Sequence, residues 1–215
     1  MKKLILWDLD GTLIDTLEDL GKAVNHALSL HGLPPHTPEE YRKMVGHGVR
    51  NLVQQALPAD RQSDEAFVDL VLAAFKAYYS DHIDVFTRPY PGIAELLSAL
   101  QERGVKMAVA SNKFQEGTEY LIKAFFPDIR FVSVLGNRPG YPLKPDPAIV
   151  EEVLEKAGAG PEEALMVGDS PTDMRTAANG GIDALAVSWG YRSRDDLAGN
   201  RIVHSVEELR ELLFY

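Results

Sequence analysis

The chain has 215 residues, 45% of them hydrophobic, and a formal net charge of −10. That length allows one sizeable core and a smaller second one. The acidic balance argues against a nucleic-acid-binding protein, which needs a basic face, and an anionic substrate would meet overall repulsion. No cysteine is present, so disulfides and thiol chemistry are excluded.

The N-terminal segment is basic over residues 1–3, but the apolar run after it is short and is interrupted by Asp8. This pattern predicts a strand and not a signal peptide. No apolar run approaches the roughly 18 residues that a membrane-spanning helix needs. We therefore expect a soluble cytoplasmic protein with neither a membrane nor a nucleic acid as partner.

Apolar runs of strand length recur along the chain and alternate, in its later part, with segments of helical spacing. Strands alternating with helices predict an α/β fold with a doubly wound, Rossmann-like parallel sheet covered on both faces. Ligands of such sheets bind beyond the carboxyl ends of the strands. The expected strands cover residues 4–9, 105–110, 130–135, 165–167, 184–187 and 201–203, and the expected helices cover 93–100, 149–157 and 173–178.

Residues 16–85 contain no segment with clear strand character. Three groups of apolar residues with helical spacing occur in this stretch, and Pro34-Pro35 and Gly46-His47-Gly48 are breaks in the helical pattern. We therefore predict a helical domain over residues 16–85, inserted after the first strand into a core formed by residues 1–15 and 86–215. The three groups are Leu17, Leu20, Val24, Ala27 and Leu28; Val49, Leu52, Val53 and Ala56; and Phe67, Leu70, Val71, Ala74, Phe75 and Tyr78.

Side chains suited to chemistry follow three of the expected strands. Asp8 and Asp10 come at the end of the first, and alternation sends both side chains in one direction. Two carboxylates that lie close together repel each other, which is costly unless a metal ion or a shared proton compensates their charge. Ser111 and Asp169 follow two further strands, and Lys144 lies in a proline-rich loop before a helix. We expect the groups that follow the strands to share one site at the carboxyl edge of the sheet.

Four short segments together resemble one protein family. They are Asp8-Leu9-Asp10-Gly11-Thr12-Leu13, Ser111-Asn112-Lys113, Lys144-Pro145-Asp146-Pro147 and Gly168-Asp169-Ser170. In this order they resemble the haloacid dehalogenase-like superfamily of phosphotransferases, and they look like its phosphoglycolate phosphatase branch. The resemblance runs from Lys2 to about Tyr191. It implies that the helical insertion is a cap, which opens for substrate and closes to exclude water.

The resemblance implies a phosphatase that uses Mg²⁺ and forms an aspartyl-phosphate. Asp8 is then the nucleophile, and Asp10 is the general acid for the leaving group and the general base for water. Asp8 and Asp169 are the expected side-chain ligands of Mg²⁺, and Asp10 contributes its backbone carbonyl by resemblance. Asp173 orients a water molecule or Lys144, or it simply places negative charge at the start of a helix.

Five residues are expected to hold the phosphate group. Ser111 and Asn112 donate hydrogen bonds, Lys144 supplies a positive charge, and the amides of Gly11 and Thr12 approach the phosphate closely. An alternative role for Ser111 is to cap the following helix.

Substrate choice is expected to come from the cap. His47 and Arg50, beside the glycine-bracketed turn, are candidates to bind a substrate carboxylate, and Lys113 is a third. The alternative is a plain turn between helices with solvated side chains. Trp189-Gly190-Tyr191 resembles a Tyr/Trp-Gly-Tyr segment of the family, to which the sequence alone assigns no role.

These residues predict a Mg²⁺-dependent phosphatase acting on a small phosphate monoester, 2-phosphoglycolate first. The alternatives are a β-phosphoglucomutase-like phosphomutase, a pyrophosphatase or nucleotidase of the same superfamily, and a non-catalytic phosphate-ligand sensor. Gly168 speaks against a mutase, because the resembled sugar phosphomutases tend to carry a second acid there, and the complete catalytic set speaks against a sensor. Six cationic residues in the insertion keep the mutase open: Lys22, Arg42, Lys43, Arg50, Arg61 and Lys76.

Overall fold

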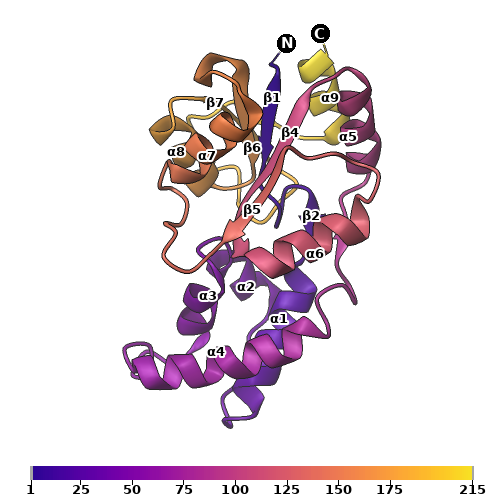
Figure 1. Cartoon of the computed structure of the whole chain (residues 1–215). Helices are drawn as coiled ribbons and strands as arrows, with labels where there is room; N and C mark the ends of the chain where they lie inside the picture. Colours follow the sequence, from indigo (N-terminus) through magenta and orange to yellow (C-terminus); the bar gives the residue numbers. More distant parts are fainter. Residues whose placement is uncertain (1, 215) are drawn as a thin grey trace.

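The computed structural model describes residues 2–214 and contains a six-stranded parallel sheet in the order β5-β4-β1-β6-β7-β8 (Figure 1). The central strand β1 (Leu4–Trp7) pairs with β4 (Lys106–Phe114) on one side and with β6 (Ala164–Gly168) on the other. Because the strand order reverses at β1, its carboxyl end is the topological switch point, where α/β sheets bind ligands. The outer strands are β5 (Ser133–Asn137), β7 (Asp183–Val187) and β8 (Ile202–Val203).

Alternation along β1 builds a core on each face of the sheet. Ile5 and Trp7 join the apolar cluster that includes residues of α5 (Ile93–Glu102), α6 (Gln115–Phe125) and α9 (Val206–Phe214). Leu4 and Leu6 join a second cluster with α7 (Ala148–Ala157) and α8 (Pro171–Asn179), and these two helices lie on the opposite side of the sheet in Figure 1. A short 3₁₀ helix, η1 (Pro161–Glu163), precedes β6. The predicted doubly wound α/β architecture is confirmed.

The helical insertion lies between two short strands. It contains α1 (Leu17–Ser29), α2 (Pro38–Met44), α3 (Val49–Ala56) and α4 (Glu65–Ser80), which Figure 1 shows below the carboxyl edge of the sheet. The strands β2 (Ile14–Asp15) and β3 (Arg88–Pro89) pair in antiparallel fashion and carry the chain out and back. The buried Asp19 carboxylate accepts hydrogen bonds from the amides of Phe86 and Thr87, which fastens the return segment to α1.

Several elements differ from the sequence expectations. The strand β4 runs on to Phe114, with an irregular register after Ala110, so Ser111 lies inside the strand and not beyond its end. The predicted buried face of α4 is correct at Val71 and Phe75 and wrong at Leu70, which is 53% exposed. Its other members, Phe67, Ala74 and Tyr78, are partly buried against the core, and the helix also buries Val68 and Tyr79. Apolar residues occur on several sides of α4, so their spacing in the sequence did not define a single buried stripe. The helices α2 and α9 were not predicted, and α6, the helix expected to follow Ser111, begins at Gln115.

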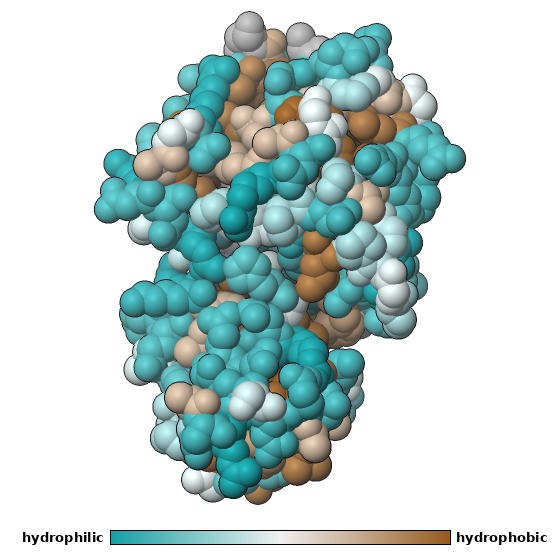
Figure 2. All heavy atoms as spheres, turned by 90° about the vertical axis from the view of Figure 1, so that its left-hand side faces the viewer, coloured by the Kyte–Doolittle hydropathy of each residue, from teal (hydrophilic) through white to brown (hydrophobic). Residues whose placement is uncertain are grey.

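Within residues 2–214, no helix combines the length and apolar character that a bilayer crossing requires. The face shown in Figure 2 is mainly hydrophilic, with apolar side chains in small groups.

Candidate active site

A pocket with room of about 40 Å³ lies between the carboxyl edge of the sheet and the helical insertion. Asp8 and Asp169 enter it directly after β1 and β6, and Ser111 enters it from β4. Asp10 lines the same pocket, in agreement with the direction that alternation predicted for Asp8 and Asp10. The insertion contributes mainly apolar side chains to the opposite wall: Leu20, Val45, Val49 and Leu52.

Lys144 supplies a buried positive charge at the base of the pocket. Its Nζ donates to Asp8 Oδ1 at 2.8 Å, to Asp173 Oδ1 at 2.7 Å and to the carbonyl of Ala110 at 2.7 Å. Burial alone would lower the pKa of Lys144, but the carboxylates of Asp173 and Asp8 outweigh it and raise this pKa above its usual value. Lys144 is therefore a fixed cation beside Asp8.

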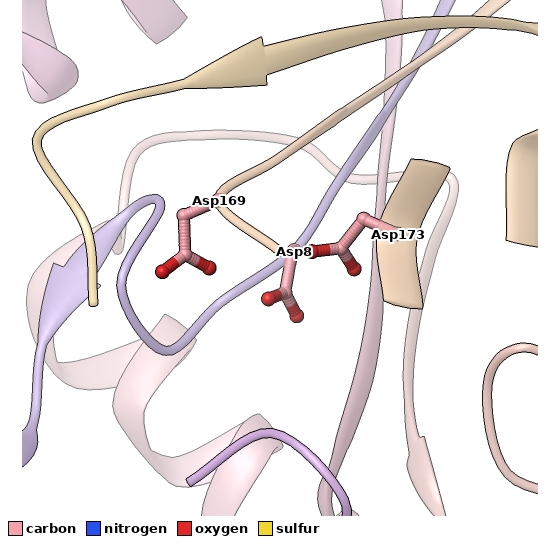
Figure 3. A group of neighbouring side chains, drawn as sticks. All are labelled: Asp8, Asp169 and Asp173. Atoms are coloured by element: carbon pink, nitrogen blue, oxygen red, sulfur yellow. The ribbon is translucent and has the colours of Figure 1, made fainter. Parts of the chain in front are cut away.

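Three carboxylates converge here, those of Asp8, Asp169 and Asp173, with one oxygen of each within 4.8 Å of the others (Figure 3). Burial, with the charge of Asp173 added, raises the pKa of Asp8 well above its usual value. Burial, again with Asp173, raises the pKa of Asp169 to about 7. One lysine thus leaves an excess of buried negative charge, which a divalent cation would compensate.

The hydrogen bonds indicate which carboxylates have an oxygen free for a cation. Both oxygens of Asp173 are engaged, Oδ1 by Lys144 and Oδ2 by the amide and hydroxyl of Ser170. Asp8 accepts at Oδ1 and Asp169 at Oδ2, and in the described chain their other oxygens accept no protein hydrogen bond. Carboxylate oxygens suit a hard cation such as Mg²⁺. This donor set therefore fits a divalent cation held by Asp8 and Asp169.

Asp173 combines the two roles that the sequence left open. It is the third residue of α8, and with the N-cap Ser170 it forms a reciprocal capping box. The same carboxylate orients Lys144. A Cβ atom on Gly168 would overlap the Asp173 side chain, so glycine is required before Asp169 for packing.

Asp10 is held on the other side of the pocket. Its Oδ1 accepts hydrogen bonds from Thr16 Oγ1 at 2.7 Å and from Lys113 Nζ at 3.3 Å. The Tyr191 hydroxyl accepts from the Thr16 amide at 2.7 Å, which fixes the segment that carries Thr16.

Two of the expected phosphate contacts are corrected. The amide of Gly11 donates to Ile14 O at 2.9 Å and that of Thr12 to Leu9 O at 3.2 Å, so both are used inside the turn. A tight turn satisfies its own amides, which the sequence did not reveal. Gly11 serves the site differently: its φ is +87°, and a Cβ there would overlap the carboxylate of Asp169.

Asn112 is a third correction. Its Nδ2 donates to Gly46 O at 3.0 Å and to Lys144 O at 3.1 Å, and its Oδ1 accepts from the Lys144 amide at 2.8 Å. The side chain therefore joins two loops, and its amide group is not available to phosphate. Ser111 does line the pocket, and the N-cap of α6 is Phe114, so Ser111 does not cap that helix.

The cap residues proposed for substrate contact lie elsewhere. Arg50 is half-exposed and pairs with Glu65 and Asp69 of α4. Neither Arg50 nor the exposed His47 is among the pocket-lining residues. Partial burial of its ring, together with Arg192 and Arg175, lowers the pKa of His47. These placements favour the alternative of a turn with solvated side chains.

Arg192 is a site residue that sequence reasoning missed. It lines the pocket, and its guanidinium donates to the carbonyls of Arg42 and Val45 at the end of α2.

The segment before Arg192, Trp189-Gly190-Tyr191, has a structural role that the sequence alone did not assign. Trp189 Nε1 donates to Thr12 O at 3.1 Å, and the Tyr191 amide donates to Asp169 Oδ2 at 2.6 Å. This segment holds the two acidic loops together, and Arg192 connects them to the insertion.

Comparison with known proteins places this geometry in a family context. The family model for haloacid dehalogenase-like hydrolases matches residues 5–187. A phosphoglycolate phosphatase of Mesorhizobium japonicum is 38% identical over 90% of this chain and 86% of its own length. A phosphoglycolate phosphatase of Aquifex aeolicus is 34% identical over 88% of this chain and 86% of its own length.

Solved structures agree in fold. One from Lactobacillus delbrueckii subsp. bulgaricus superposes with a TM-score of 0.91, 34% identity and 99% coverage of both chains. CbbY from Rhodobacter sphaeroides in complex with phosphate superposes with a TM-score of 0.78 and 26% identity, over 97% of this chain and 96% of that one.

Proposed function

Because the chain belongs to the haloacid dehalogenase-like hydrolases and is a phosphoric monoester hydrolase, we propose that it hydrolyses a small phosphate monoester, 2-phosphoglycolate first among the candidates. The observation that carries the proposal is the position of Asp8, at the switch point of the sheet with Lys144 at 2.8 Å. Relatives that are named phosphoglycolate phosphatases support the choice of substrate.

In the first step, an oxygen of Asp8 attacks phosphorus, a new O–P bond forms, and the ester O–P bond breaks. Asp10 gives its proton to the departing oxygen, so the leaving group departs as an alcohol. Lys144 stabilises the negative charge of the transferring phosphoryl group. In the second step, water attacks the phosphorus of the aspartyl-phosphate while Asp10 takes a proton from it, and phosphate and free Asp8 result.

The cofactor that we propose is Mg²⁺. Asp8 and Asp169 would hold it through their free oxygens, and by family resemblance the backbone carbonyl of Asp10 would be a further ligand. When bound, Mg²⁺ supplies positive charge to the phosphate group and offsets the repulsion between the acids. Asp173 serves by holding Lys144 in place.

The pocket favours a small substrate, and its lining favours a hydrolase over a mutase. Its room of about 40 Å³, which is enough for about three water molecules, favours a small ester over a large one. The cations that line it, Lys113, Lys144 and Arg192, all follow or lie within strands of the sheet. Within residues 2–214, no cation of the insertion lines the pocket. A phosphomutase needs such cations to retain a bisphosphate, so the hydrolase is favoured over the mutase.

The test is phosphate release from a panel of esters with Mg²⁺ or EDTA. The panel contains 2-phosphoglycolate, sugar phosphates, nucleotides and pyrophosphate, and Asp8→Asn is the blank. We expect Mg²⁺-dependent release with the highest kcat/KM for 2-phosphoglycolate. A higher kcat/KM for a different ester would overturn the proposed substrate. Activity that EDTA leaves unchanged would overturn the proposal that Mg²⁺ is the cofactor.

A further inference from the structure

One buried contact between the helical insertion and the sheet reaches Asp10. Lys113, in β4, has a side chain that is 1% exposed. Its Nζ lies 2.7 Å from the hydroxyl of Tyr79 and 3.3 Å and 3.5 Å from the two carboxylate oxygens of Asp10. Tyr79 belongs to α4, so the contact joins elements that are separate in the chain.

The position of the Tyr79 hydroxyl is set by packing. The residue is fully buried, and its ring stacks on Phe75 with centroids 5.1 Å apart. The ring also meets the edge of Phe114, the last residue of β4, at 6.1 Å. A ring held on two sides cannot swing, so its hydroxyl is a fixed acceptor for Lys113.

Lys113 itself has few partners. Burying an ammonium group is costly unless it is paired and hydrogen-bonded. Asp10 is the carboxylate that pairs with it, and the Tyr79 hydroxyl is the neutral oxygen that it reaches. Losing the hydroxyl removes one of the contacts that hold the ammonium, and Lys113 then gains freedom to shift relative to Asp10.

We propose that Tyr79 is a positioning residue for the reaction: through Lys113 it holds the Asp10 carboxyl group in the orientation that delivers a proton to the leaving oxygen. The inference rests on the proposed function of Asp10. Thr16 Oγ1 and Lys113 Nζ are the two donors on the carboxyl group, and without the second it can rotate. A displacement of about 1 Å costs up to about 100-fold in rate at such a position.

The test compares two small substrates that differ in their need for a proton. The alkoxide leaving group of 2-phosphoglycolate must be protonated, whereas acetyl phosphate releases acetate, which is stable as an anion. In Tyr79→Phe, which keeps Lys113, the ratio of their kcat/KM values therefore reports on the acid step. In Lys113→Met it also reports any contact of Lys113 with the substrate carboxylate. If the panel identifies another alkyl phosphate as the best substrate of the wild type, that ester replaces 2-phosphoglycolate.

We expect Tyr79→Phe, which keeps the packed ring, to lower kcat/KM about tenfold for the alkyl phosphate and less than about twofold for acetyl phosphate. Lys113→Met should show the same selectivity with a larger loss, about 100-fold for the alkyl phosphate. The matched control is Tyr78→Phe on the same helix, whose ring stacks between His26 and His82. It should leave both values unchanged.

Equal losses for the two substrates in Tyr79→Phe, or no loss, would overturn the inference, since a purely structural role affects both substrates alike. If Lys113→Met does not fold, Tyr79→Phe decides alone. Failure of the wild type to hydrolyse any ester would overturn the proposed function and this inference with it. A uniform loss beside normal wild-type turnover would overturn only the inference.

Discussion

Lys144 Nζ lies 2.8 Å from Asp8 Oδ1, although the two residues are 136 positions apart in the chain. This pair brings the loop before α7 to the carboxyl end of β1, and Asp173 holds the lysine from the other side. One buried cation therefore pairs with two buried acids, Asp8 and Asp173, and a third acid, Asp169, lies beside them. The stability of the protein and the chemistry of its site depend on the same charges.

Replacing Lys144 tests this dependence. Lys144→Met leaves Asp8, Asp169 and Asp173 without their buried cation, and breaking a buried pair costs about 3–5 kcal/mol. We expect a large fall in the Tm of the metal-free protein and loss of turnover, measured by thermal unfolding in EDTA and by phosphate release. An unchanged Tm would contradict the placement of Lys144 among the acids.

The raised pKa of Asp169 predicts a pH effect on the metal-free protein. Its folded-state pKa is about 7, above the ordinary value of 3.8, so the folded state holds the proton over a wider pH range. The stability that this proton provides is complete below pH 4 and is lost as pH rises towards 7. Asp169→Asn removes the penalty, so its Tm advantage over the wild type in EDTA should grow from pH 5 to pH 8.

Adding Mg²⁺ completes that test. The ion should raise the Tm of the wild type at pH 8 and leave Asp169→Asn nearly unchanged, because ligand binding stabilises only a protein with an intact site. An equal rise in both proteins would show that the ion binds elsewhere.

Arg50 gives a prediction opposite to the one that its sequence position suggests. Its guanidinium pairs with Glu65 and Asp69 on the surface of α4. Arg50→Ala should change KM less than about twofold for every ester and lower stability by about 1 kcal/mol or less, as expected for an exposed pair. A KM increase confined to carboxylate-bearing esters would return Arg50 to the substrate pocket.

Arg192 should control how firmly the insertion closes on the sheet. It donates to the carbonyls of Arg42 and Val45, and Asn112 donates to Gly46 O in the same loop. Arg192→Gln should speed hydrogen exchange in residues 42–48 and raise KM several-fold, because lost contacts lower the local opening free energy.

The matched control is Arg194→Gln, an exposed arginine in the same segment, which should leave both measurements unchanged. Unchanged exchange in Arg192→Gln would contradict a closing role for Arg192.

Most of the pocket residues that the sheet contributes were predictable because parallel strands end at one edge, although Ser111 lies inside β4 and not beyond it. Asp8, Asp10, Ser111 and Asp169 all line the pocket as alternation and the α/β pattern indicated. Lys144 also lines it, although its loop position alone did not point there.

Hydrogen-bond partners were not predictable. Asn112 is a capable donor, but the choice between a phosphate and the carbonyls of Gly46 and Lys144 depends on contacts up to 66 residues away in the chain. Tyr79 and Arg192 act through similarly distant partners. The direction of the Arg50 side chain depends on how α3 packs against α4. Because α4 carries apolar residues on several sides, its sequence did not show which of them are fully buried.

The central claim is that Asp8 becomes phosphorylated, and acid quenching during turnover of a ³²P-labelled ester tests it most directly. We expect hydroxylamine-sensitive label on the peptide that contains Asp8, more of it in Asp10→Asn, where attack by water is slowed, and none in Asp8→Asn. Full turnover without label on that peptide, or hydrolysis retained by Asp8→Asn, would contradict the account.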